Sequence, residues 1–245
     1  MAEMAVADGV THIVCTPHIT PGVYHNTGPD IAVAVALLQD ELDQRGIPLR
    51  LGAGADIHIS PTLVADLDAG IAPTLAGSRA MLFEPPHHVL PPHMDKVVAR
   101  LIAAGYVPVI THPERLSWIE SRYDLVVALS DMGAPMQITA GSITGAFGKR
   151  PQYWAERMLD EGRVDIIASD AHNTRARSPR LSRARELVAA RLGEAEAENL
   201  VLWRPAALLN GESLPDRIGI VAPQTPAKDA GVMNSIKGWF NNFRG

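Results

Sequence analysis

Two kinds of apolar pattern alternate along this chain. Short runs rich in β-branched residues are typical of strands, and the longer segments between them, with apolar residues three and four positions apart, are typical of helices. Such alternation is typical of βα units around a parallel sheet. The sequence therefore predicts an α/β domain with strands in six runs, at residues 11–18, 48–57, 80–86, 107–113, 135–142 and 164–172.

The predicted helices differ in how clearly their ends are marked. The segment 30–46 begins at Asp30, a suitable N-cap, and ends at Gly46, and a second segment ends at Gly105. The five helices are expected at residues 30–46, 93–105, 116–132, 151–161 and 179–192.

Composition narrows the class of protein. A chain of 245 residues that is 47% hydrophobic can bury one sizeable core. The net charge of -5 and the pI near 6.0 do not favour nucleic acid as a partner. A single cysteine excludes an internal disulfide framework, no apolar run reaches the roughly 18 to 20 residues of a membrane span, and the first residues do not resemble a signal peptide. We therefore expect a cytoplasmic protein.

Residues able to bind a divalent metal stand at the ends of five of the six runs. In α/β barrels the carboxyl ends of the strands converge on one mouth, so ligands distant in sequence become neighbours there. Mixed imidazole and carboxylate ligands suit Mn, Fe or Zn, and a carboxylate can bridge two ions. The pattern predicts a metal cluster held by His18, Asp56, Glu84, His112, Asp170 and His172.

Two arginines and the single cysteine bear on the chemistry. Arg115 and Arg177 follow shortly after His112 and His172, and guanidinium groups beside a metal cluster suggest a phosphorylated substrate. Cys15 lies in "IVCTP", without the glycine-rich loop and arginine of a cysteine phosphatase, so we interpret it as a buried strand residue.

Further histidines have no assigned role at this point. His58 could line the mouth beside Asp56 or face solvent. His87, His88 and His93 in "PPHHVLPPHM" could rim a substrate cleft, but the simplest interpretation of this stretch is a proline-stiffened loop.

Four motifs together resemble a known family. "CTPHITPGVYHN", "LFEPP", "ITHPER" and "SDAHNT", in this order within residues 1–192, are similar to the metal-dependent bacterial protein-tyrosine phosphatases of the polymerase and histidinol phosphatase (PHP) superfamily, of the capsular and exopolysaccharide type. The resemblance implies a distorted (β/α)7 barrel with a manganese-type multinuclear site. It also implies hydrolysis of phosphotyrosine on an autophosphorylating tyrosine kinase that controls polysaccharide export. By position the six ligand candidates would hold the metals, with Glu84 as a bridge, and the two arginines would hold the phosphate.

Two other functions stay open. One is hydrolysis of a small phosphate ester such as histidinol phosphate, which would use the same metal chemistry. The other is a non-catalytic relative that binds a kinase tail without hydrolysing it.

The chain departs from the family pattern in two places. Asp56 stands where relatives usually carry Glu, one methylene longer. The family also begins with a strand that carries a His-x-His pair, and this first strand is missing here, while "AEMAVADG" resembles the last turns of a helix that ends at Gly9. We expect a chain shortened at its amino end by a misassigned start, with a weakened relative as the alternative.

The composition changes near residue 210. We expect the phosphatase domain at residues 1–210 and a linker with an amphipathic tail at residues 211–245. The tail could dock weakly on a membrane surface or a partner, or fold back. Residues 232–245 have only Lys237 and Arg244 as basic groups, so their attraction to anionic lipid would be weak. The apolar face of the tail would comprise Val232, Ile236, Trp239, Phe240 and Phe243.

Overall fold

The computed structural model describes residues 1–218. The tail with its expected amphipathic helix lies outside these residues. Within the described part, none of the helices combines the length and the apolar character needed to cross a membrane.

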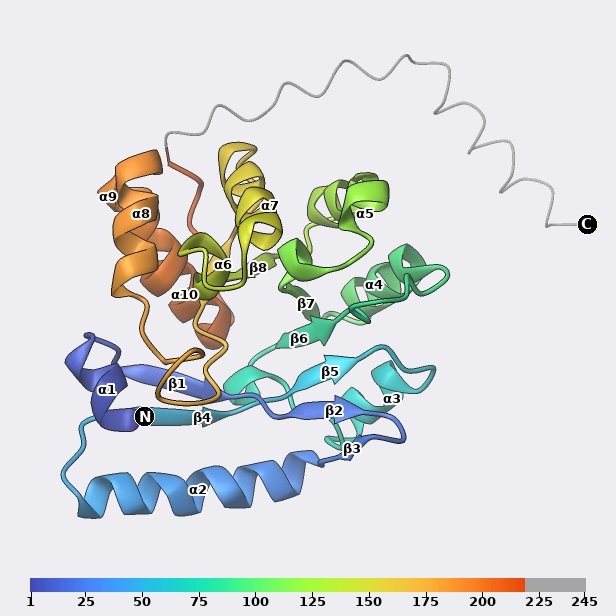
Figure 1. Cartoon of the computed structure of the whole chain (residues 1–245). Coiled ribbons are helices and arrows are strands. Elements are labelled where there is room, and N and C mark those ends of the chain that lie inside the picture. Colours follow the sequence, from blue (N-terminus) through green and yellow to red (C-terminus); the bar gives the residue numbers. More distant parts are fainter. Residues whose placement is uncertain (219–245) are drawn as a thin grey trace, which may run out of the picture.

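The centre of the molecule is a mostly parallel sheet of seven strands (Figure 1). All neighbouring pairs in it are parallel except β2 with β3. In spatial order its strands are β3 (Tyr24–His25), β2 (His18–Thr20), β5 (Asp56–His58), β6 (Ala80–Glu84), β7 (Val107–Thr111), β8 (Met136–Thr139) and β9 (Ile166–Ala168). The α/β class expected from the sequence is therefore correct.

The first two predicted strands are each divided, which corrects the prediction of six continuous strands. The run 11–18 forms β1 (His12–Cys15) and β2, and the run 48–57 forms β4 (Arg50–Ala53) and β5. β1 pairs in parallel with β4 in a separate two-stranded sheet. The chain keeps its direction across the break, where the Asp56 amide donates to the Pro17 carbonyl at 3.2 Å. Pro17 has no amide hydrogen to continue the ladder, which is a physical reason for the interruption.

All five predicted helices are present. They are α2 (Gly28–Gln44), α4 (Met94–Ala103), α5 (Ile119–Asp131), α7 (Lys149–Asp160) and α8 (Ser182–Leu192). Asp30 is not the N-cap of α2: the cap is Thr27, whose hydroxyl accepts from the Asp30 amide at 3.4 Å. The amino-terminal helix expected up to Gly9 is α1 (Ala2–Ala7), and Gly9 follows with a left-handed φ of 89°.

Several short helices were not predicted. They are α3 (Leu63–Asp68), α6 (Ala140–Ile143), α9 (Glu194–Glu198), α10 (Arg204–Asn210), the 3-10 turns η1 (Leu75–Gly77) and η2 (Pro113–Arg115), and the π-helical turn η3 (Asn199–Trp203). The residues after α10 remain attached to the domain, since the Ile218 amide donates to Glu196 and the Arg204 guanidinium donates to the Pro215 carbonyl.

The two faces of the sheet bury different clusters. Met81 and Phe83 of β6 point into the main core, which the long helices complete. Leu82 lies between them in sequence and points to the opposite face, where it joins Val109 and a smaller apolar cluster. Glu84 is two residues beyond Leu82 and therefore lies on the same face of the sheet as Leu82 and Val109, at the carboxyl end of its strand. We call this face the inner face. The inner face thus changes from apolar to polar where the strands end.

Candidate metal centre

Strand register brings four polar side chains onto the inner face. His18 of β2 is the pairing partner of Asp56 in β5, and His58 of β5 is the partner of Glu84 in β6. Asp56 and His58 are two residues apart, so they also share a face. The His18 Nδ1 and His58 Nε2 atoms lie 2.8 and 2.7 Å from the same Glu84 oxygen, Oε2.

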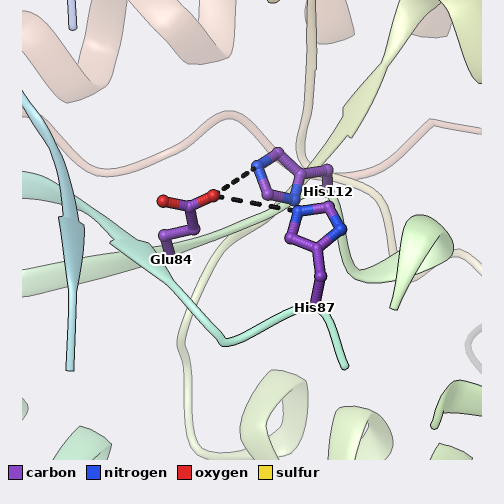
Figure 2. A group of neighbouring side chains, drawn as sticks. All are labelled: Glu84, His87 and His112. Atoms are coloured by element: carbon purple, nitrogen blue, oxygen red, sulfur yellow. Dashed lines mark ion pairs between the residues drawn. The ribbon is translucent and has the colours of Figure 1, made fainter. Parts of the chain in front are cut away.

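The other Glu84 oxygen faces a second pair of imidazoles. Nε2 of His112 lies 3.6 Å from Oε1, and Nε2 of His87 lies 3.8 Å from it (Figure 2). His112 Nε2 is also 3.6 Å from a carboxylate oxygen of Asp56. Glu84 is therefore a buried carboxylate surrounded by four imidazoles and a second carboxylate.

Burial and hydrogen bonding act in opposite directions on the acidic groups. Burial alone would raise the pKa of Glu84, but the hydrogen bonds from His18 and His58 outweigh it, and its pKa is lowered. The hydrogen bond to Glu84 raises the pKa of His18. Burial raises the pKa of Asp56, and burial together with the charges of neighbouring groups lowers the pKa of His87 to about 4.

The donor set fits a divalent transition metal. Two groups of side chains bring their ligand atoms within 4.8 Å of one another, namely His18 with Asp56 and Glu84, and Glu84 with His87 and His112. Nitrogen and carboxylate oxygen donors of this kind suit Mn, Fe or Zn. His112 is 3% exposed and its Nδ1 has no hydrogen-bond partner among the described residues, which leaves a buried polar group unsatisfied.

Asp170 and its arginine partners form a neighbouring group. Arg115 Nη1 lies 2.7 Å from Asp170 Oδ2, and Arg177 pairs with the same oxygen. His172 is more exposed, and its Nδ1 lies 3.0 Å from the Asp170 carbonyl. Both predicted arginines therefore lie beside a predicted metal ligand.

Backbone strain marks two of these residues. His112 has φ 37° and ψ 48°, and Asp170 has φ 48°, a left-handed conformation that non-glycine residues seldom adopt. Such strain costs roughly 1 to 3 kcal/mol and persists only where the surroundings enforce it, often at functional sites. Both residues stand just after strands whose ends face the site.

Other buried residues hold the surrounding loops in place. Glu114 is fully buried, and its Oε1 accepts hydrogen bonds from the Thr139 amide at 3.0 Å and the Ser142 hydroxyl at 2.7 Å. The Arg115 guanidinium lies over the ring of Phe147, 4.8 Å from its centroid. Sequence reasoning did not identify Glu114 or Phe147, because nothing local in the sequence reveals these contacts.

A cavity of about 570 Å³ opens beside this group of residues. It lies between β1 and the end of β9, and its polar walls include His18, Asp56 and His112. Cys15 also lines it, half-buried, and burial raises the pKa of its thiol. The cysteine is in a strand, as expected, but it faces this cavity instead of being sealed in a core.

The structure brings the predicted site residues together unequally. His18, Asp56, Glu84 and His112 converge around one carboxylate, whereas Asp170 and His172 lie on the wall of the same cavity and outside the two close ligand groups. His58, for which the sequence left two positions open, points to Glu84. His87 lies beside Glu84 and His112. The sequence had predicted neither His58 nor His87 as a metal ligand.

The fold and the site define a class of α/β proteins with a histidine- and carboxylate-lined metal-type centre at the carboxyl ends of parallel strands. Residues 1–210 match the family described as capsular polysaccharide synthesis, CpsB/CapC. The chain belongs to this family.

Individual relatives agree with this assignment. The chain is 34% identical over 178 residues to the tyrosine-protein phosphatase YwqE of Bacillus subtilis, covering 73% of this chain and 70% of that protein. It is 27% identical over 206 residues to the tyrosine-protein phosphatase CpsB of Streptococcus pneumoniae, covering 82% and 85%. A solved structure from work on YwqE and CpsB, which are described as unique metal-dependent tyrosine phosphatases, is similar with a TM-score of 0.80 and 30% identity, over 90% of this chain and 89% of that one. The resemblance inferred from the four motifs is thus confirmed at the level of the family.

Proposed function

We propose that this chain is a metal-dependent protein-tyrosine phosphatase. Its substrate would be phosphotyrosine on a bacterial tyrosine kinase that regulates capsular or exopolysaccharide synthesis. The observation that carries the proposal is the buried Glu84 carboxylate, with four imidazoles and Asp56 around it, in a chain related to tyrosine-protein phosphatases. The two arginines beside Asp170 give the site the positive charge that a phosphate dianion requires.

Each group has a distinct part in this proposal. A bound divalent ion supplies the Lewis acidity for phosphate-ester hydrolysis, so no cysteine nucleophile is required. The residues that would hold the metal are His18, Asp56, Glu84, His112, Asp170 and His172. Arg115 and Arg177 would bind the phosphate oxygens and balance the charge that develops on them. The carboxylate of Asp170, which lines the cavity, pairs with both guanidinium groups.

Finer assignments belong to the same proposal. Manganese is the metal we propose, with the kinase tail as partner and the cytoplasm as location, where a lone cysteine would stay reduced. We also assign the sheet to a distorted (β/α)7 barrel of the PHP type. Parallel strands whose carboxyl ends meet at one site support that assignment.

The test compares metal content and substrate choice. Protein stripped with a chelator and reconstituted with manganese should bind metal and hydrolyse a phosphotyrosine peptide faster than histidinol phosphate, and the stripped protein should be inactive. Glu84→Gln keeps the shape of the side chain and should lose both metal and activity.

Each contrary outcome points to a different conclusion. Absence of bound metal after reconstitution, or full activity without metal, contradicts the proposal. Faster hydrolysis of histidinol phosphate would indicate a small-ester hydrolase. Metal binding without hydrolysis of either substrate would indicate a kinase-binding protein.

A further inference from the structure

His87 lies in the loop that follows β6, three residues after Glu84. Its backbone is held on both sides by a distant segment. The His87 carbonyl accepts hydrogen bonds from the Ser117 amide and the Ser117 hydroxyl, both at 2.9 Å, and the Pro86 carbonyl accepts from the Trp118 indole at 3.0 Å. These contacts anchor the backbone from which the His87 ring extends.

Figure 2 shows the His87 ring beside Glu84, with the dashed line reaching the same carboxylate oxygen as the line from His112. His18 and His58 lie at the other oxygen, Oε2. The centroid of the His87 ring is 4.8 Å from that of His112, and its Nε2 is 3.8 Å from Glu84 Oε1. The side chain is 27% exposed, so the ring is largely enclosed. His87 and His112 therefore approach one oxygen from two different elements.

The spacing on this side of Glu84 differs from that on the other. His18 and His58 lie at hydrogen-bond distance from Oε2, whereas His87 and His112 lie 3.6 to 3.8 Å from Oε1, too far for a direct hydrogen bond. Ligand atoms about 2.0 to 2.2 Å from a shared tetrahedral ion lie about 3.4 Å apart. The gap therefore has the size that a coordinated ion would bridge.

The burial of His112 makes the gap on this side of Glu84 more significant. This side chain is 3% exposed, and its nearest carboxylate oxygens lie 3.6 Å from Nε2. A buried imidazole without a hydrogen bond is costly unless another partner is present. A metal ion in the gap would give Nε2, the atom that faces Glu84 Oε1, such a partner.

We propose that His87 is a ligand of a metal ion bound on the Oε1 side of Glu84, together with His112. This inference rests on the proposed metal dependence and adds to the centre a ligand from a loop, outside the strand ends. Glu84 then connects this ion to the group formed with His18 and Asp56.

The neighbouring His88 provides a matched control, because it is exposed and belongs to neither ligand group. The full chain and its His87→Ala, His87→Phe and His88→Ala variants would be stripped, reconstituted with manganese and analysed for metal per chain. Titration with Co²⁺, followed by its visible absorption, gives affinity and reports on the ligand set without any assay of activity.

We expect His87→Ala and His87→Phe to lose bound metal and to weaken Co²⁺ binding by about 10-fold or more, since losing even an outer-shell partner costs on the order of 10- to 100-fold. His88→Ala should match the unmodified chain. The phenylalanine variant keeps the ring that packs on His112, so a purely structural role for His87 predicts normal metal binding in it.

Two results separate this inference from the function itself. If the unmodified chain binds metal and His87→Phe binds it equally well, His87 is not a ligand and the metal-dependent function stands. If the unmodified chain binds no metal, both proposals are wrong.

Discussion

Arg115 donates to Asp170 across 55 positions of sequence, with Nη1 2.7 Å from Oδ2. Arg177 pairs with the same oxygen. One carboxylate at a strained position on the wall of the cavity therefore pairs with two guanidinium groups. In the proposed function these two arginines bind the phosphate, whereas Glu84 and its imidazoles bind the metal.

The first prediction concerns these two arginines. Arg115→Ala or Arg177→Ala should lower kcat/KM for a phosphotyrosine peptide by about 10- to 100-fold, because a hydrogen bond to a charged group contributes roughly 1.5 to 3 kcal/mol. Metal per chain should not change. Arg175→Ala, in the same loop and exposed, serves as control. Unchanged kinetics in both variants would show that the two arginines do not bind the phosphate of the substrate.

The second prediction concerns Phe147, which lies beneath Arg115. A Cβ added at Gly141 would come within 2.8 Å of the Phe147 ring, so the ring is confined from that side. Phe147→Leu should reduce kcat/KM by less than Arg115→Ala, since a cation–π contact contributes about 0.5 to 2 kcal/mol.

A double-mutant cycle distinguishes positioning of the arginine from general packing. If Phe147 acts through Arg115, the leucine change should have little further effect on kcat/KM in the Arg115→Ala background. Equal losses in both backgrounds would show that Phe147 works independently of the arginine.

The third prediction concerns Cys15. Burial raises the pKa of this thiol, which favours the unreactive protonated form. Cys15→Ser should therefore hydrolyse the phosphotyrosine peptide at a rate within about twofold of the unmodified chain. Loss of activity in this variant while metal content stays normal would instead indicate that Cys15 takes part in the reaction as a nucleophile.

The strand-end pattern predicted part of the site because strand register is visible in the sequence. His18, Asp56 and Glu84 each fall at or near the end of a β-branched run, and parallel pairing brings such ends together. His58 was harder to place, although it stands two residues after Asp56 and so on the same face. The pattern cannot say how far a strand continues into the site.

Loop residues escaped prediction for a different reason. The position of His87 depends on hydrogen bonds to Ser117 and Trp118, some 30 residues away in sequence. Such contacts leave no periodic signal. The division of the first strand was also missed. The β-branched run in the sequence continues across Pro17, although the hydrogen-bond ladder between the strands does not.

The fourth prediction concerns stability and begins with Asp8, just after α1. Its carboxylate accepts hydrogen bonds from the Leu181 amide at 2.6 Å and from the Ser182 amide and hydroxyl at 3.0 and 2.6 Å. α8 has no side-chain cap of its own, so Asp8 caps it from a distant part of the chain. Asp8→Ala should lower the free energy of unfolding by about 0.5 to 2 kcal/mol, the usual contribution of an N-cap.

The pH dependence of that loss follows from the pKa of Asp8. Burial opposes ionisation, but the hydrogen bonds from Ser182 and Leu181 outweigh it and lower the pKa below 3.8. A carboxylate whose pKa is lowered on folding stabilises the protein above its unfolded pKa, and this contribution disappears as the pH falls through the folded value. Urea unfolding should therefore show a constant deficit for Asp8→Asn between about pH 5 and 7 that shrinks below about pH 4. Asp40→Asn, on the exposed surface of α2, should show no such deficit, and a deficit for Asp8→Asn that persists unchanged in acid would mean that the carboxylate charge has no part in the cap.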